Sequence, residues 1–146
     1  SVKRMDYTVI GDSVNLAARL ESANKYYGTS VLLADSTVAQ LRAPGDLRAI
    51  DLLRVKGKSR PIAVFEPLGC HRPEIREKLL GGLPRFDEAR QLYLDRQWHD
   101  AARCFETFLE RCADDTVARL YLDRCNYFAD TDPGPDWDGV WTLTQK

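Results

Sequence analysis

The sequence predicts an α+β fold followed by a small all-α region. Over residues 1–69, short runs of β-branched and apolar residues alternate with segments whose apolar residues recur at helical spacing. Beyond residue 84 only the helical period remains. A charged stretch interrupted by proline and glycine separates these two parts, as expected for a linker at a domain boundary. The predicted organisation is therefore an α+β part at 1–69, a linker at 70–84 and a helical region at 85–146.

The first part opens with a short strand and a helix. Residues 7–10 are rich in β-forming side chains, and the run stops at Gly11. Asp12 is a suitable N-cap for a helix, and Gly28 is a suitable residue to end it. The apolar residues between these two ends recur at helical spacing, and they are Leu16, Leu20, Ala23 and Tyr27.

Three further strands complete the first part. Residues 31–34 predict a strand, with a short helix after it. Strands at 49–56 and 61–67 follow, and the polar, glycine-containing connection at 57–60 is typical of a hairpin. The mixture of strands and helices in this order indicates an α+β or α/β pattern.

Three apolar stripes predict three helices in the second part. The first two helices resemble a tetratricopeptide unit, in which small residues let two antiparallel helices approach and aromatic residues fill the gap. Arrays of such units normally need about three repeats, so the helix that starts near Thr116 is expected to cap the pair. The alternative is a generic helical tail. The side chains that carry the resemblance are Ala89, Leu92, Trp98, Ala101, Phe105 and Phe108.

Composition excludes several classes of protein. The net charge of −1 argues against a dedicated nucleic-acid binder, and no apolar run reaches the length that a membrane span needs. No signal peptide is recognised at the start of the chain. We expect a cytoplasmic location without membrane contact by these residues, and a parent protein anchored to the inner membrane is compatible with it. Zinc ligation is not expected, because no CxxC pair or clustered histidine accompanies Cys70, Cys104, Cys112 and Cys125.

Two blocks of sequence resemble the class III nucleotidyl cyclases. Residues 6–21 read DYTVIGDSVNLAARLE, where that family has a strand ending at a glycine and then a helix with a V-N-x-A-x-R core. Residues 55–58 read VKGK and are followed by PIAVFEP at 61–67, which resembles the terminal hairpin of the same domain. The blocks stand in the family's order. The chain therefore resembles the C-terminal half of an adenylate cyclase catalytic domain, part of an α/β sandwich, followed by the helical region.

The resemblance implies roles for four side chains. Thr8 matches the position that hydrogen-bonds the purine base, and Asn15 matches the residue that orients the ribose. Arg19 matches the residue that stabilises charge at the α-phosphate in the transition state, and Lys56 matches the lysine on the terminal phosphates. These residues would bind ATP in a composite site at the interface of a homodimer. Most adenylate cyclases carry Asp where Thr8 stands, although bacterial members with Thr exist. Guanylate cyclases tend to carry Cys or a similar small residue there, and the Thr8 hydroxyl can accept a hydrogen bond from the adenine amino group, so adenine is favoured over guanine.

The spacing of Asn15 and Arg19 supports this interpretation independently. Residues four apart on a helix share one face, and the planar guanidinium of an arginine can bind two phosphate oxygens at once. The alternatives are a solvated helix face for Asn15 and Arg19, an ordinary strand residue at Thr8 and a polar hairpin tip at Lys56.

The implied reaction converts ATP to cyclic AMP and pyrophosphate with two divalent ions, Mg²⁺ or Mn²⁺. In the family, the metal-binding aspartates lie in the first half of the catalytic domain, and Asp6 and Asp12 do not match them. We therefore expect the metal ligands outside this chain and expect the chain alone to be inactive. The alternative function is a non-catalytic helical or dimerisation module of a signalling protein.

Overall fold

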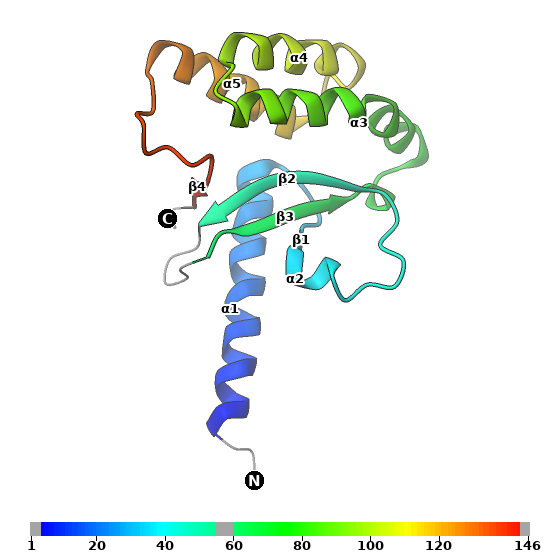
Figure 1. Ribbon diagram of the computed structural model, residues 1–146. Coiled ribbons are helices and arrows are strands. Elements are labelled where there is room, and N and C mark those ends of the chain that lie inside the picture. Colours follow the sequence, from blue (N-terminus) through cyan, green and yellow to red (C-terminus); the bar gives the residue numbers. More distant parts are fainter. Residues whose placement is uncertain (1–3, 55–59, 144–146) are drawn as a thin grey trace.

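The predicted α+β fold with a helical region is confirmed (Figure 1). The computed structural model describes the backbone of residues 4–54 and 60–143, and the side chains of residues 16–54 and 60–143. The elements in chain order are α1 (Arg4–Tyr27), β1 (Leu33–Ala34), α2 (Asp35–Val38), β2 (Leu47–Arg54), β3 (Ile62–Pro67), the 3-10 turn η1 (Leu68–Cys70), α3 (Pro73–Leu94), α4 (Trp98–Arg111), α5 (Thr116–Asp130) and β4 (Trp141–Thr142).

The strands form one sheet in the order β1-β3-β2-β4. β3 is antiparallel to both β1 and β2, as a hairpin between β2 and β3 requires. The predicted hairpin connection at 57–60 lies almost entirely outside the described residues. β4 pairs in parallel with the end of β2, where Leu53 stands opposite Trp141. No element was predicted in this C-terminal stretch.

The predicted strand at residues 7–10 is wrong, because α1 runs without interruption from Arg4 to Tyr27. A strand needs a neighbouring strand for its backbone hydrogen bonds, whereas a helix makes these bonds within itself. The end of the helix was predicted correctly: Gly28 follows it with a φ of +69°, which favours glycine. A Cβ atom at Gly28 would also lie 2.6 Å from the Thr116 hydroxyl oxygen, so the position has no room for a side chain.

The segment predicted as a linker is largely helical, since α3 begins at Pro73 and includes Pro84. Pro73 stands in the first turn of the helix, where a missing N–H costs nothing. The two glycines serve close packing rather than a turn. A Cβ at Gly82 would lie 2.9 Å from the Phe108 ring, and one at Gly81 would meet the guanidinium of Arg111. The division of the chain into domains stays a prediction.

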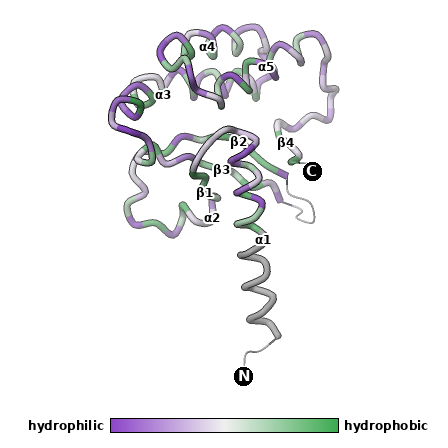
Figure 2. Tube along the Cα trace, turned by 180° about the vertical axis from the view of Figure 1, so that it is seen from behind, coloured by the Kyte–Doolittle hydropathy of each residue, from purple (hydrophilic) through white to green (hydrophobic). Residues whose placement is uncertain are grey.

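One buried cluster joins the sheet to the three C-terminal helices. In Figure 1, α3, α4 and α5 lie together on one side of the sheet, and Figure 2 shows hydrophobic residues recurring along the strands and these helices. Tyr121 of α5 makes the most direct link, because its hydroxyl donates a hydrogen bond to the Ile50 carbonyl at 2.5 Å. Arg90 of α3 donates to the same hydroxyl at 3.1 Å. Helices and sheet therefore share polar as well as apolar contacts.

Aromatic side chains fill the space between the helices. Phe86 of α3 packs against Phe105 and Phe108 of α4, with ring centroids 5.8 and 5.4 Å apart. Ala89 and Ala101 are fully buried, as the close approach of two helices requires. This packing agrees with the predicted helix pair, while its resemblance to a tetratricopeptide unit stays a prediction. Within the described residues, no helix combines the length and hydropathy that a membrane-spanning segment requires.

Candidate functional site

The structure describes one of the four predicted nucleotide-site side chains. Arg19 is half-buried on α1. The side chains of Thr8 and Asn15 lie outside the described residues, as does Lys56 altogether. The helix does run through both Asn15 and Arg19, which gives them the four-residue spacing of one helix face. The assigned roles stay predictions.

Contacts at the end of α1 hold this helix against the sheet. The hydroxyl of Tyr27 donates to the Asp51 carboxylate on β2, with 2.5 Å between the oxygens. The ring of Tyr26 stacks on Trp141 of β4 at a centroid distance of 5.9 Å. Because β4 pairs with the end of β2, the helix that carries Arg19 is fixed relative to the strand that leads into the predicted hairpin.

Arg124 of α5 completes this contact with a buried ion pair. Its guanidinium donates to Asp51 at 2.9 Å and to the Tyr26 hydroxyl at 3.3 Å, and it lies 4.0 Å from the centre of the Trp141 ring. Asp51 is 2 % exposed and Arg124 is 5 % exposed. Burial opposes the charge on Arg124, but the Asp51 carboxylate, acting together with the neighbouring tyrosine hydroxyls, outweighs burial and raises the arginine's pKa. Burial, together with Asp51, raises the pKa of Tyr27, which therefore acts as a neutral donor.

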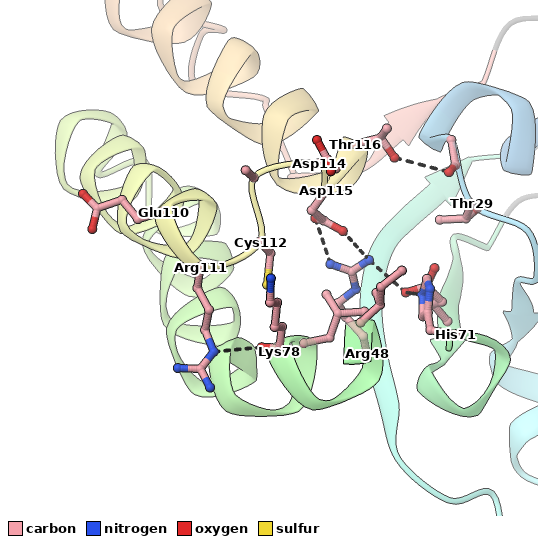
Figure 3. Close-up of a pocket in the computed structure, with 15 residues that line it drawn as sticks. Thr29, Arg48, His71, Lys78, Glu110, Arg111, Cys112, Asp114, Asp115 and Thr116 are labelled. Atoms are coloured by element: carbon pink, nitrogen blue, oxygen red, sulfur yellow. Dashed lines mark hydrogen bonds and ion pairs between the residues drawn. The ribbon is translucent and has the colours of Figure 1, made fainter. Parts of the chain in front are cut away.

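A second buried network centres on Arg48 of β2. Its guanidinium donates to Glu66 of β3 at 2.8 Å and to Asp115 at 2.9 Å. Asp115 also caps α5 by accepting a hydrogen bond from the Ala118 amide at 2.9 Å. Burial disfavours the charge on Arg48, but Asp115 and Glu66 outweigh this effect and raise its pKa. Figure 3 shows the guanidinium lying between Asp115 and His71.

A cavity of about 380 Å³ opens beside this network, between α3, the end of α4 and the start of α5. Its basic side chains, Arg48, Lys78 and Arg111, are balanced by acidic ones. A polyphosphate in this cavity would meet carboxylates as well as cations, and Arg48 is already paired with two of them. The cavity is therefore poorly suited to a nucleoside triphosphate. The acidic lining residues are Glu66, Glu110, Asp114 and Asp115.

The described residues do not fit a pair of Mg²⁺ or Mn²⁺ ions. Within 16–54 and 60–143, the one group of three side chains close enough to share an ion is Glu66, Cys70 and His71. It contains a single carboxylate, and Arg48 already binds that carboxylate. Mg²⁺ and Mn²⁺ prefer oxygen ligands over sulfur and nitrogen. No step of a reaction is therefore assigned to divalent ions at these residues.

Sequence reasoning missed both buried ionic networks. Arg48 could have been found, because it stands two residues before Ile50 and strand alternation places both on one face. Asp51 follows Ile50 directly, so alternation places it on the other face. A bulge between Ala49 and Asp51 brings it inward, and a bulge is not visible in the residue pattern.

The known proteins that this chain is similar to are named adenylate cyclases. It is 30 % identical over 125 residues to the adenylate cyclase, terminal-differentiation specific, of Dictyostelium discoideum. It is 41 % identical over 70 residues to adenylate cyclase 1 of Rhizobium meliloti (strain 1021), and 46 % identical over 66 residues to the adenylate cyclase of Anabaena cylindrica. Part of this chain is thus homologous to adenylate cyclases. No protein-family model and no solved structure matches it.

The three matches differ in extent. They cover 84 %, 48 % and 43 % of this chain, but only 6 %, 10 % and 13 % of the three relatives. Because the Dictyostelium match omits only about a sixth of the chain, it includes the whole of α3 and α4. This adenylate cyclase homology therefore extends beyond the sheet into the helical region.

Proposed function

We propose that the chain is part of a class III adenylate cyclase that converts ATP to cyclic AMP and pyrophosphate. The proposal is carried by the similarity to three proteins of that name, together with the Asn15 and Arg19 pair on α1. The chain spans 13 % or less of those relatives, so the activity belongs to the whole protein. That protein acts as a homodimer in the cytoplasm.

In this reaction, the residues of the chain position ATP and neutralise its negative charge. The ribose 3′-hydroxyl attacks the α-phosphate, and pyrophosphate leaves. Arg19 neutralises the charge that develops on the α-phosphate, while Asn15 orients the ribose. Phosphoryl transfer depends mainly on such contacts, since the protein takes little covalent part in it. Thr8 binds the adenine base and Lys56 binds the terminal phosphates. The ligands of the divalent ions lie outside these residues.

Replacing Arg19 tests the transition-state role. In the intact protein, Arg19→Ala should lower kcat with a smaller effect on KM, because the contact tightens as charge develops. The expected loss is about 2–4 kcal/mol, the scale for one preorganised electrostatic group. Steady-state kinetics with ATP measure it. Arg42→Ala, which removes an exposed arginine between α2 and β2, is the matched control and should leave kcat unchanged. A kcat within twofold of the wild type for Arg19→Ala would contradict the role.

The 146-residue chain alone should produce no cyclic AMP. The described residues hold no cluster of carboxylates for two ions, and the reaction needs such a cluster to neutralise the triphosphate. An assay with ATP and Mn²⁺ at increasing chain concentration measures this. Cyclic AMP that rises in proportion to the chain would show that the ligands are present after all. If Arg19→Ala also left kcat of the intact protein unchanged, the non-catalytic dimerisation module would be the better interpretation.

A further inference from the structure

We propose that Glu66, Cys70 and His71 form a binding site for a transition-metal ion of the Zn²⁺ type. Glu66 lies near the end of β3, Cys70 ends η1 and His71 follows it, and two of the three, Glu66 and His71, line the cavity beside Arg48. Sequence spacing did not predict this site. It is distinct from the pair of divalent ions in the proposed cyclase reaction, and the proposal does not depend on that reaction.

The ligand atoms stand at distances that one ion can bridge. One sulfur, one imidazole nitrogen and one carboxylate oxygen lie within 4.8 Å of one another. The Nε2 of His71 is 3.2 Å from the Oε1 of Glu66. Two light-atom ligands at the usual zinc bond length of a tetrahedral site are about 3.3 Å apart. The separation between these two atoms is therefore that of two ligands on one ion.

The imidazole of His71 has a buried nitrogen atom that makes no hydrogen bond within the described part of the chain. Its Nε2 is buried and makes no hydrogen bond with any described residue, although the Glu66 oxygen is near. Buried polar atoms in folded proteins nearly always have a partner, and each exception calls for a reason such as an ion. A metal ion between His71 and Glu66 would supply that partner.

Neighbouring residues hold two ligands in place. The His71 amide donates to the Leu68 carbonyl at 3.2 Å, and Arg76 donates to the His71 carbonyl at 3.0 Å. Glu66 is held by Arg48 at 2.8 Å. A hydrogen bond to a ligating carboxylate, such as the one from Arg48, orients the ligand and contributes to affinity. The Glu66 carboxylate and the His71 backbone are therefore held in place before an ion arrives.

The charge balance tolerates a cation at this point. Arg48 contacts Glu66 and is also paired with Asp115, so its charge stays compensated when Glu66 shares its carboxylate with a metal ion. Burial, followed by Glu66, raises the pKa of the Cys70 thiol, so an incoming ion must displace its proton. Cys70 is exposed and His71 is partly exposed, which leaves an entry path and an open coordination position. A sulfur, nitrogen and oxygen set selects Zn²⁺ or Co²⁺ over Mg²⁺ and Ca²⁺.

Titration of the 146-residue chain with Zn²⁺, and with Co²⁺ as a spectroscopic probe, tests the site. We expect one ion per chain, with a sulfur-to-cobalt charge-transfer band that reports thiolate ligation. Cys70→Ser should remove that band. Both Cys70→Ser and His71→Gln should weaken Zn²⁺ binding by at least roughly tenfold. The matched controls are His99→Gln and Glu74→Gln, which change an exposed imidazole and an exposed carboxylate elsewhere. Both should bind as the wild type does.

Three results would overturn the proposal. They are the absence of Zn²⁺ binding by a folded wild-type chain, equal binding by the Cys70→Ser and His71→Gln variants, and displacement of Zn²⁺ by an equal concentration of Mg²⁺. Circular dichroism of each variant without metal establishes that it is folded. None of these measurements depends on cyclase activity, so the site and the proposed function can fail separately.

Discussion

Arg124→Ala should lower the free energy of unfolding of the chain by about 3–5 kcal/mol, the usual cost of removing one partner from a buried ion pair. The Asp51 carboxylate, which is 2 % exposed in the wild type, would keep only the Tyr27 hydroxyl and the Leu52 amide as donors. The substitution also removes the guanidinium that lies 4.0 Å from the centre of the Trp141 ring. Both losses fall where α5, α1 and the sheet meet, so the end of α1 should loosen as well.

Urea unfolding followed by circular dichroism measures this cost. Arg119→Ala is the matched control, because Arg119 is an exposed arginine on the same helix; its change should stay within about 0.5 kcal/mol. Adding Asp51→Asn to Arg124→Ala removes the uncompensated charge, so the double variant should lose less than the sum of the two single variants. Equal losses for Arg124→Ala and Arg119→Ala would show that the buried pair contributes no stability.

The helices α4 and α5 and the hairpin were predictable because their signals are local. Apolar residues at helical spacing mark α4 and α5, and the strand-forming runs of β2 and β3 flank a polar connection. β4 was not predictable. It is two residues long, and it is held by distant partners: Leu53 across the ladder, Arg124 over the Trp141 ring and an Arg54–Asp138 ion pair. Such contacts leave no trace in the local residue pattern.

The candidate sites divide in the same way. The four-residue spacing of Asn15 and Arg19 is a property of one helix, so the sequence alone predicts a shared face. The grouping of Glu66, Cys70 and His71 is not a property of one element, because it depends on how the η1 turn folds back on the end of β3. The zinc spacings expected from sequence are pairs of cysteines or histidines. A glutamate four residues before a Cys-His pair falls outside them.

Phe105→Ala is expected to cost about 3–5 kcal/mol, the usual loss for a fully buried phenylalanine. Phe105 is 0 % exposed. It stacks on Tyr121 of α5 at 5.2 Å between centroids and meets the edge of Phe86 of α3 at 5.8 Å. Rigid rings on both sides cannot collapse into the space that the side chain leaves. The cavity should therefore remain and add its own cost to the lost burial.

Thermal and urea unfolding of the variants measure this loss. Tyr127→Ala is the matched control, since it removes an aromatic ring that is 62 % exposed and should change stability by about 0.5 kcal/mol or less. Phe105→Leu, which keeps most of the apolar volume, should lose less than Phe105→Ala. A loss below about 1 kcal/mol for Phe105→Ala would mean that the ring is not in the core. Because the buried cluster runs from the helices into the sheet, the loss should appear in one cooperative transition rather than in a separate melting of the helices.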